Sequence, residues 1–540
     1  MKNGNIKWLK SNAGFAAMPI IFLSFLNIIV SYLAMRFAFV SKDVLDIATG
    51  NQTGSLKTSL FVLCALISSY IIIHITYSLI DVKLSCTITN KLSNKIYKRI
   101  ISSDYCEISK FHSGELVNRL NGDVSVITQG LMTIIPRVVQ MVTKVIFSFT
   151  ALYMLDKSFA VVCIVILPFV TVAGRIYGKR MKNLHKKCRT AGGRVLSHMQ
   201  EGIRNILILK TFVKEYASSK KLSELQDDSM RLNVKAGIIS MIANLLFFSV
   251  MTFGYYCALI WCAYKISIGL MTVGTLTAIL QLFDQLQTPF DEFSTIIPMY
   301  YKTTASVERI RELENLQSDE VEDTVKLDDF SSIVIQNLTF GYKDEENIID
   351  NFSAKIEKGK MTVIGGDSGS GKSTLTKITM GVLKAKEGKI YFDNNGDIVE
   401  CDTKTRINFA YVPQGNMILS GSIKNNIAFY DDDVTEDTII QSAKDACIYD
   451  YIMSLPDGFD TVLGEGGLGL SEGQIQRLAI ARALSIGAAV IILDEATSAL
   501  DAETEEKVLT NIKGRNNLTS VVISHRKCAF NIADSVLYIH

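Results

Sequence analysis

The stretch GDSGSGKST, Gly366 to Thr374, decides how the C-terminal part of the chain folds. It fits the pattern Gly-x-x-x-x-Gly-Lys-[Ser/Thr], in which successive backbone N–H groups surround phosphate groups at the N-terminus of a helix. The lysine of such a loop reaches the β- and γ-phosphates, and the hydroxyl that follows it faces Mg²⁺. Residues 361–365 fit a short buried strand, and the residues from 372 onward fit a helix. This order of strand, loop and helix predicts a nucleotide-binding site.

A second motif, VIILDEATSALD, occupies Val490 to Asp501. Its first four residues form a continuous apolar run, as in a central parallel strand whose C-terminal end opens at a ligand site. Two acids follow directly. We expect Asp494 to bind Mg²⁺ and Glu495 to reach the water that attacks in phosphoryl transfer. The two motifs together predict binding and hydrolysis of ATP.

Between these two motifs lies LSEGQIQR, Leu470 to Arg477. Ser471 is a good N-cap residue, and the helix that it starts would point its positive end at a phosphate group. We therefore expect this segment to bind nucleotide as well.

Composition predicts that part of the chain lies in a membrane. The chain has 540 residues, of which 48% are hydrophobic, so it is too long for one domain and too apolar for an ordinary soluble protein. The net charge of +2, without a basic tail, argues against binding to nucleic acid. The ten cysteines contain no Cys-x-x-Cys pair, so their spacing supports neither a disulfide framework nor a zinc site.

Six long apolar runs lie in the first 300 residues, and each can cross about 30 Å of hydrocarbon as a helix of roughly 20 residues. The runs cover residues 15–39, 58–80, 131–155, 158–179, 237–263 and 269–298. The first run is too long for the apolar region of a cleaved signal peptide, so we interpret it as a span.

The charge of the connecting loops predicts the orientation. The connectors after the second and fourth runs are long and basic, whereas the others are short and nearly uncharged. Positive residues favour the cytoplasmic side. We therefore expect both long loops, both termini and the nucleotide-binding part in the cytoplasm, with the spans in the plasma membrane.

With these motifs in this order, nearly the whole chain resembles an ABC exporter half-transporter. The resemblance implies an α-helical transmembrane domain of six spans, residues 1–310, with two long cytoplasmic loops. A linker at residues 311–330 and an α/β P-loop ABC ATPase domain at residues 331–540 would follow. It implies ATP and Mg²⁺ as ligands, and ATP-driven export of a small molecule, peptide or lipid across the plasma membrane.

The family's functional residues fall on matching positions of this chain. The resemblance implies that adenine stacks on Tyr342 and that Asp501 makes a dimer contact. The phosphate and signature loops would supply the ATP-binding residues Gly366, Ser368, Gly369, Ser370, Gly371, Lys372, Ser373, Thr374, Ser471, Gly473 and Gln474. Mg²⁺ would bind Ser373, Gln414 and Asp494, and the catalytic residues would be Glu495, His525 and Gln414.

One position departs from the family pattern, because Glu472 stands where the signature LSGGQ has its first glycine. A carboxylate near another ATP would repel its γ-phosphate. The favoured interpretation is that the side chain turns outward as a first-turn acid of the helix.

Each ATP in this family lies between the phosphate loop of one ATPase domain and the signature loop of another, so the resemblance implies a homodimer or a heterodimer with a similar half-transporter. It also implies two coupling segments that dock on an ATPase domain near Gln414. These are Phe111 to Asp123 and Glu201 to Glu215.

The substrate is not predicted by the sequence. Ionisable residues within spans are functional candidates. Arg137, Gln140 and Lys144 fall near one face of the third span, and Gln281, Asp284 and Gln285 near one face of the sixth. They could line the cavity, with Asp284 pairing with Arg137 or Lys144, or they could be structural pairs or side chains that reach the membrane interface.

Two other kinds of function fit the sequence less well than export. A regulatory or partner subunit with little activity of its own should have lost Glu495 or His525, and this chain has both. A soluble ABC ATPase would lack spans, and an importer ATPase would have its membrane domain on a separate chain.

Overall fold

A computed structural model describes residues 8, 14–319, 323–327, 329–342, 347–367, 369–415, 418–464, 467, 469–515 and 517–539. Contacts within the chain divide it into two compact units. The helical unit comprises residues 1–97 and 114–312, and the sheet unit comprises residues 98–113 and 313–540.

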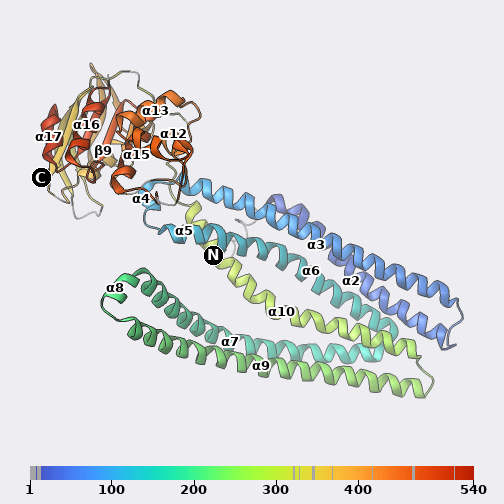
Figure 1. The fold of residues 1–540 in the computed structure, drawn as a ribbon. Helices are drawn as coiled ribbons and strands as arrows, with labels where there is room; N and C mark the ends of the chain where they lie inside the picture. Colours follow the sequence, from blue (N-terminus) through green and yellow to red (C-terminus); the bar gives the residue numbers. More distant parts are fainter. Residues whose placement is uncertain are drawn as a thin grey trace. The chain divides into compact units, whose positions relative to one another are not determined.

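Six long helices form most of the helical unit (Figure 1). They are α2 (Gly14–Ala48), α3 (Leu56–Ile101), α6 (Val124–Leu155), α7 (Lys157–Arg204), α9 (Glu215–Ser267) and α10 (Val273–Glu314). The first five predicted apolar runs each lie within one of them, and the sixth, predicted at residues 269–298, begins four residues before α10. The shortest has 32 residues and the longest 53, so at 1.5 Å per residue they measure about 50 to 80 Å. They are longer than the roughly 20 residues that a bilayer requires.

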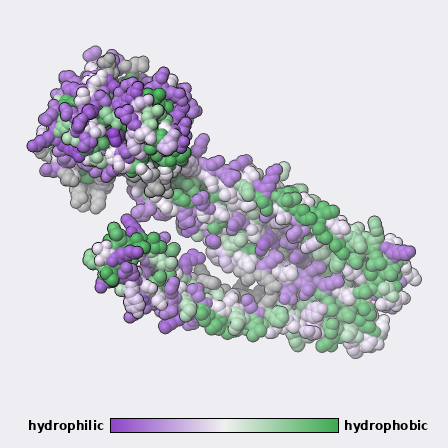
Figure 2. Space-filling view, viewed as in Figure 1, coloured by the Kyte–Doolittle hydropathy of each residue, from purple (hydrophilic) through white to green (hydrophobic). Residues whose placement is uncertain are grey.

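By length and composition, four helical stretches of the described residues can cross a membrane: Ala16–Ala48, Leu56–Ile101, Ser113–Leu155 and Glu215–Ser267. Apolar side chains are spread over the surface of the long helices in Figure 2, whereas hydrophilic side chains dominate the sheet unit. The predicted fold class, a helical membrane domain followed by an ATPase domain, is confirmed. A total of six spans is consistent with the structure.

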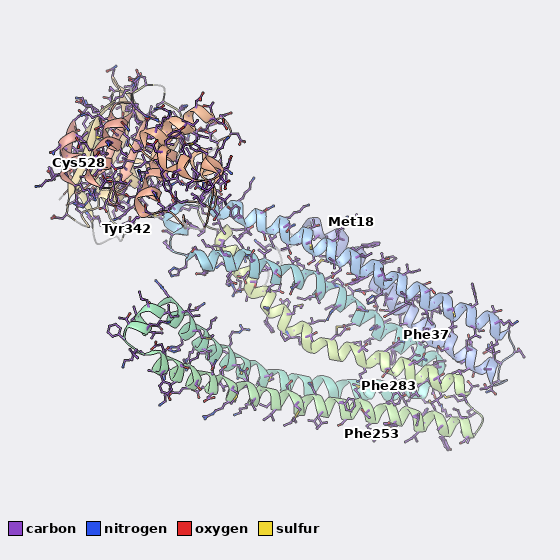
Figure 3. The ribbon with its side chains drawn as sticks, in the orientation of Figure 1. Met18, Phe37, Phe253, Phe283, Tyr342 and Cys528 are labelled. Carbon is purple, nitrogen blue, oxygen red and sulfur yellow. The ribbon has the colours of Figure 1, made fainter. Side chains whose placement is uncertain are left out.

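Helices α7 and α9 run side by side as a hairpin that turns at α8 (Ile206–Thr211) (Figure 1). Met181, Cys188 and Ala236 are buried between them. A larger core lies around Leu152 of α6 and Phe159 of α7. There the ring of Phe283 from α10, labelled in Figure 3, lies 6.4 Å from that of Phe159.

Two buried aspartates cap helices within the helical unit. Asp156 caps α7 by accepting hydrogen bonds from the backbone N–H groups of Ser158 and Phe159. The same carboxylate accepts bonds from Trp261 Nε1 at 3.1 Å and Lys265 Nζ at 2.6 Å, both on α9. In the same way Asp46 of α2 accepts a bond of 3.0 Å from the N–H of Gly274 in the first turn of α10. These contacts join helices that the apolar pattern alone does not pair.

Three short elements connect α3 to α6. They are α4 (Tyr105–Ile108), α5 (Ser113–Asn118) and the π-helix η1 (Arg119–Asp123). The segment Lys98–Ser113 belongs to the sheet unit, where Cys106 packs on the core and the Lys377 ammonium lies 5.7 Å from the ring centre of Tyr105. Residues 114–123 of the predicted coupling segment, 111–123, lie in the helical unit, and the docking of this segment on an ATPase domain stays a prediction.

Two β-sheets build the core of the sheet unit. An antiparallel sheet has the order β2-β1-β4-β5, and a parallel sheet has the order β11-β3-β10-β9-β6. The strands are β1 (Ser332–Phe340), β2 (Ile349–Glu357), β3 (Met361–Gly366), β4 (Glu387–Asn394), β5 (Asp397–Glu400), β6 (Phe409–Val412), β7 (Gly421–Ser422), β8 (Val462–Leu463), β9 (Val490–Asp494), β10 (Thr519–Ile523) and β11 (Ser535–Ile539). All residues of β9 and β10 are buried, as the apolar run at β9 predicts for a central strand.

Helices surround the parallel sheet. They are α11 (Lys372–Thr379), α12 (Ile423–Ala428), α13 (Glu436–Asp445), α14 (Tyr449–Ser454), α15 (Glu472–Ser485), α16 (Ala502–Lys513) and α17 (Lys527–Ile532). Asp534, just before β11, accepts bonds from the N–H of Met361 at 2.9 Å and from Lys513 at 2.7 Å. The hydrogen bond from Lys513, and to a smaller extent the one from the Met361 N–H, hold the pKa of Asp534 below its ordinary value.

Candidate nucleotide site

The ends of four neighbouring parallel strands meet at one edge of the sheet. The phosphate loop follows β3, and His525 follows β10. Asp494 ends β9 with Glu495 directly after it, and Gln414 lies two residues beyond β6. Ligands of open α/β sheets bind beyond the carboxyl ends of the strands. The parallel topology therefore brings together residues that are up to 159 positions apart in sequence.

The phosphate loop runs directly into α11, as the motif predicts. Lys372 is 6% exposed and its Nζ donates to the carbonyl oxygens of Gly366 at 2.9 Å and Asp367 at 2.7 Å. Gly371 occupies the N-cap position of α11 with a φ of +90°. Ser368 lies outside the described residues. The loop thus places a cation and the free N–H groups of a helix N-terminus together, as a phosphate site requires.

Tyr342 stands beside the start of α11. It is 59% exposed, and its hydroxyl lies 3.4 Å from Thr374 Oγ1. Its ring packs edge to face on Phe340 at a centroid distance of 5.1 Å. Figure 3 labels Tyr342 at the surface of the sheet unit. An exposed aromatic face next to a phosphate loop suits stacking with a base.

Oxygen ligands gather between the phosphate loop and β9. Ser373 Oγ donates to Asp494 Oδ1 at 3.0 Å, and the hydroxyl of Tyr411 donates to Asp494 Oδ2 at 3.0 Å. Burial, followed by the charge of Asp494, raises the pKa of Tyr411, so this hydroxyl remains a donor. Tyr411 is not among the predicted site residues, although it stands only three residues before Gln414.

This set of ligands fits Mg²⁺. One carboxylate and one hydroxyl are the usual protein ligands when phosphates and waters complete an octahedral shell. Among the described residues, no group of three or more His, Cys, Asp or Glu side chains offers a metal site made by protein alone. The hard oxygen ligands and their proximity to the phosphate loop match a nucleotide-bound magnesium.

The three predicted catalytic residues are neighbours. Gln414 Nε2 donates to Glu495 Oε2 at 2.6 Å, and His525 Nε2 lies 3.7 Å from Glu495 Oε1. Glu495 has a φ of +53°, a left-handed backbone conformation that is rare outside glycine. Backbone strain of this kind is often found at active sites, where the surrounding structure maintains it.

The signature segment starts α15 as predicted. Ser471 Oγ accepts from the N–H of Gln474 at 3.3 Å, and the Gln474 side chain accepts from the N–H of Ser471 at 2.8 Å. This reciprocal capping box fixes the helix start. Glu472 is exposed in the first turn, which supports its interpretation as a favourable helix-start acid. Gly473 packs on the loop after β9, where an added Cβ would lie 3.0 Å from the Ala499 carbonyl oxygen.

The polar residues predicted for the membrane cavity make contacts between helices. Lys144 Nζ donates to Thr288 Oγ1 at 3.4 Å, and the hydroxyl of Ser148 donates to Gln285 Oε1 at 3.3 Å, so these faces of α6 and α10 meet. Arg137 lies near the carboxylate of Asp81 on α3. Asp284 is exposed. These contacts favour the structural interpretation for Lys144 and Gln285, while the role of Asp284 stays a prediction.

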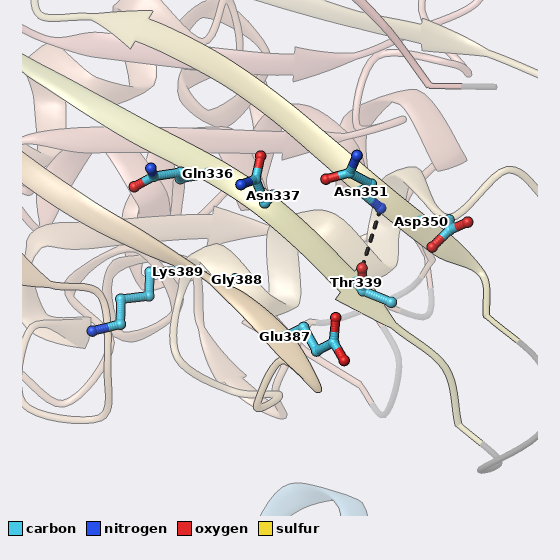
Figure 4. A pocket seen from close by; sticks show the side chains of 8 residues that line it. All are labelled: Gln336, Asn337, Thr339, Asp350, Asn351, Glu387, Gly388 and Lys389. Atoms are coloured by element: carbon cyan, nitrogen blue, oxygen red, sulfur yellow. Dashed lines mark hydrogen bonds between the residues drawn. The ribbon is translucent and has the colours of Figure 1, made fainter.

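A separate depression of about 450 Å³ lies on the antiparallel sheet. Figure 4 shows its polar lining, from β1, β2 and β4, with the carboxylates of Asp350 and Glu387 away from the Lys389 ammonium. None of the predicted site residues lines it. The strand ends of the parallel sheet, where those residues converge, are therefore the stronger candidate for the nucleotide site.

Comparisons with known proteins agree with this geometry. Residues 20–290 match the model of the ABC transporter transmembrane region, and residues 349–498 match that of the ABC transporter. The chain is 28% identical to an ATP-dependent lipid A-core flippase of Desulfotalea psychrophila, covering 97% of this chain and 92% of the relative. It is 31% identical to a protein of the same name from Pseudomonas fluorescens, covering 84% and 76%.

A solved structure of a bacterial Atm1-family ABC exporter with ATP bound has a similar fold. The two structures superpose with a TM-score of 0.80 at 22% sequence identity, and the match covers 98% of this chain and 94% of the exporter chain.

Proposed function

The chain belongs to the ABC transporter family, and on this premise we propose that it is a half-transporter that pairs with a second chain to export its substrate. It is a membrane protein and an ATPase whose hydrolysis is coupled to transport. We propose in addition that the protein is a dimer and that it lies in the plasma membrane. Both termini and the sheet unit would then face the cytoplasm. The basic loops after the second and fourth apolar runs support that orientation.

The observation that carries the proposal is the convergence of Ser373, Asp494, Gln414, Glu495 and His525 at neighbouring strand ends. Lys372 and the N–H groups around it would bind the phosphates of ATP, and Tyr342 would stack on adenine. Glu495, whose Oε2 accepts a hydrogen bond of 2.6 Å from Gln414 Nε2, would accept a proton from the attacking water, and Gln414 would help to orient that water. His525 would bind the γ-phosphate beside it.

Mg²⁺ would bind at Ser373 and Asp494, with Gln414 nearby, and would neutralise charge on the phosphate oxygens. Tyr411 would keep Asp494 oriented through its 3.0 Å hydrogen bond.

We infer that the signature loop of one chain completes the ATP site of the other. Ser471, Gly473 and Gln474 at the start of α15 would face that ATP with the positive end of the helix. Because this chain keeps Glu495 and His525, a homodimer would have two hydrolysing sites. A heterodimer with a similar half-transporter stays the alternative.

The exposed apolar turn around α8 supports a coupling role. Leu207 is 75% exposed, Phe212 68% and Val213 79%, all within the predicted coupling segment Glu201 to Glu215. We propose that this turn docks on the sheet unit of the partner chain, so that ATP-driven closure moves α7 and α9. Phe212→Asp should uncouple transport while sparing basal ATPase. Equal loss of both activities would contradict this role.

The cargo that best fits is an amphipathic molecule. Two relatives are named for lipid A-core, and the exposed carboxylate of Asp284 places a charge among apolar helices. If lipids stimulate hydrolysis and peptides do not, this class is supported.

The deciding experiment measures ATP hydrolysis by the purified chain in lipid nanodiscs, beside a Glu495→Gln variant. Strong hydrolysis that the variant abolishes would support a competent homodimer. Activity no higher than that of the variant would instead favour the alternative, a partner subunit with little activity of its own.

A further inference from the structure

The loop from Glu495 to Asp501 contains strain at its first residue. Glu495 adopts a φ of +53°, which an amino acid with a side chain keeps only if its surroundings hold it. Two backbone bonds act locally: Glu495 N–H donates to the Ile523 carbonyl at 3.1 Å, and Ser498 N–H donates to the Glu495 carbonyl at 3.2 Å. The rest of the loop is held by side chains from two other elements.

On one side the loop is held by Gln476 of α15, the helix that begins with the signature segment. Its Nε2 donates to Ser498 Oγ at 3.0 Å, and its Oε1 accepts from the N–H of Ala499 at 2.9 Å. The side-chain amide of Gln476 thus forms hydrogen bonds with two consecutive residues of the loop. Because both partners lie in the loop, a shift of α15 pulls on it directly.

On the other side the loop is held by Arg526, the residue after His525. Its guanidinium donates to the carbonyl oxygens of Ser498 at 2.7 Å and Leu500 at 2.5 Å. It also forms an ion pair of 3.0 Å with Glu505, whose side chain is 1% exposed and accepts a bond of 2.8 Å from Thr497. A planar guanidinium, with five N–H donors in a fixed fork, suits two carbonyls and a carboxylate together.

We propose that Gln476 and Arg526 are positioning residues that brace this loop between the signature helix and the strand end that carries His525. The brace maintains the strained backbone of Glu495 and thereby keeps its carboxylate beside Gln414 and His525. It also gives the signature helix a mechanical connection to the catalytic base of the same chain. This inference rests on the proposed ATPase function of Glu495, and neither residue is assigned a contact with ATP.

The test measures kcat and KM for ATP in nanodiscs with wild type, Glu495→Gln, Gln476→Leu, Gln476→Glu and Arg526→Lys. Gln476→Leu removes both loop bonds and should lower kcat about tenfold or more, with KM within about twofold. Gln476→Glu can still accept from the Ala499 N–H and the Ser498 hydroxyl, so it should restore most of kcat. Arg526→Lys keeps the charge but not the three bonds, so it should lower kcat although the ion pair with Glu505 can persist.

Gln441→Leu is the matched control, because Gln441 is an exposed glutamine of α13 that bonds only Asp445 in its own helix among the described contacts. It should leave kcat unchanged. The unfolding temperature of every variant is measured alongside. A fall in kcat that comes with a lower unfolding temperature and is not restored by Gln476→Glu would overturn the proposal, since a merely structural role predicts that result.

The outcomes separate the brace from the proposed function. If Glu495→Gln abolishes hydrolysis while Gln476→Leu and Arg526→Lys keep the wild-type kcat, the brace is wrong and the ATPase assignment stands. If the wild type hydrolyses no faster than Glu495→Gln, both are overturned.

Discussion

Gly371→Ala should weaken ATP binding, and the size of the effect follows from the backbone angle of Gly371 and from the atoms around it. Gly371 has a φ of +90°, which costs a residue with a Cβ about 1–2 kcal/mol. That Cβ would also lie 2.8 Å from Ile348 Cγ2 and 3.1 Å from Ile349 Cγ1. Overpacking of this kind costs about 1–3 kcal/mol. The sum is about 2–5 kcal/mol. If the substituted loop relaxes from this conformation without ATP and must regain it on binding, the Kd for ATP rises at least about thirtyfold.

Gly369→Ala separates the two costs, because Gly369 also has a positive φ, +88°, but an added Cβ would meet nothing within 4 Å. This variant should show only the effect of backbone strain, which is a rise in the Kd for ATP of about fivefold to thirtyfold. Adding Ile348→Ala to Gly371→Ala removes the closest clash and should recover about fivefold or more.

The assay is calorimetric titration of Mg-ATP into the purified chain with Glu495→Gln in the background, so that hydrolysis does not interfere. The reasoning is refuted if Gly371→Ala binds ATP no more weakly than Gly369→Ala, or if Ile348→Ala recovers nothing.

Three further predictions concern the metal, a helix cap and pH. Ser373→Ala should raise the Mg²⁺ concentration needed for half-maximal ATPase, read from a Mg²⁺ titration, because it removes one of the two predicted protein ligands. Asp156→Ala should lower the apparent Tm in detergent by several degrees, since it deletes a buried cap and the bonds from Trp261 and Lys265; Asp156→Asn, which can still cap, should lower it less. The pKa of Asp534 is lowered in the folded chain, chiefly by Lys513, so the stability that it contributes is present above its unfolded pKa of about 3.9 and is lost as pH falls through the folded value. The Tm difference between wild type and Asp534→Asn should therefore be constant from pH 7 to about 5 and shrink toward pH 3; a difference that grows on acidification would contradict the sign.

Local patterns predicted the elements that carry the chemistry. The apolar run at β9 and the glycines before α11 each specify a backbone within a few residues, and Ser471 caps its helix as its side chain predicts. The parallel order of the strands then brings Asp494 to Ser373 without further information.

Contacts between distant segments could not be predicted in the same way. Gln476 meets Ser498 across 22 residues, and Arg526 meets Glu505 across 21, while nothing in the local sequence indicates which way these side chains point. The contacts of Tyr105 and Cys106, which precede the coupling segment predicted at residues 111–123, likewise join segments that no periodicity pairs.

The hairpin of α7 and α9 acts as a lever arm. A helix of 53 residues is about 80 Å long, and its antiparallel neighbour along much of that length stiffens it against bending. If such a rod tilts by about 5° around one end, its other end travels about 7 Å, more than one helical turn. A small rotation at one end of the hairpin thus becomes a large displacement at the other. The length of the hairpin sets the ratio of that displacement to the rotation angle.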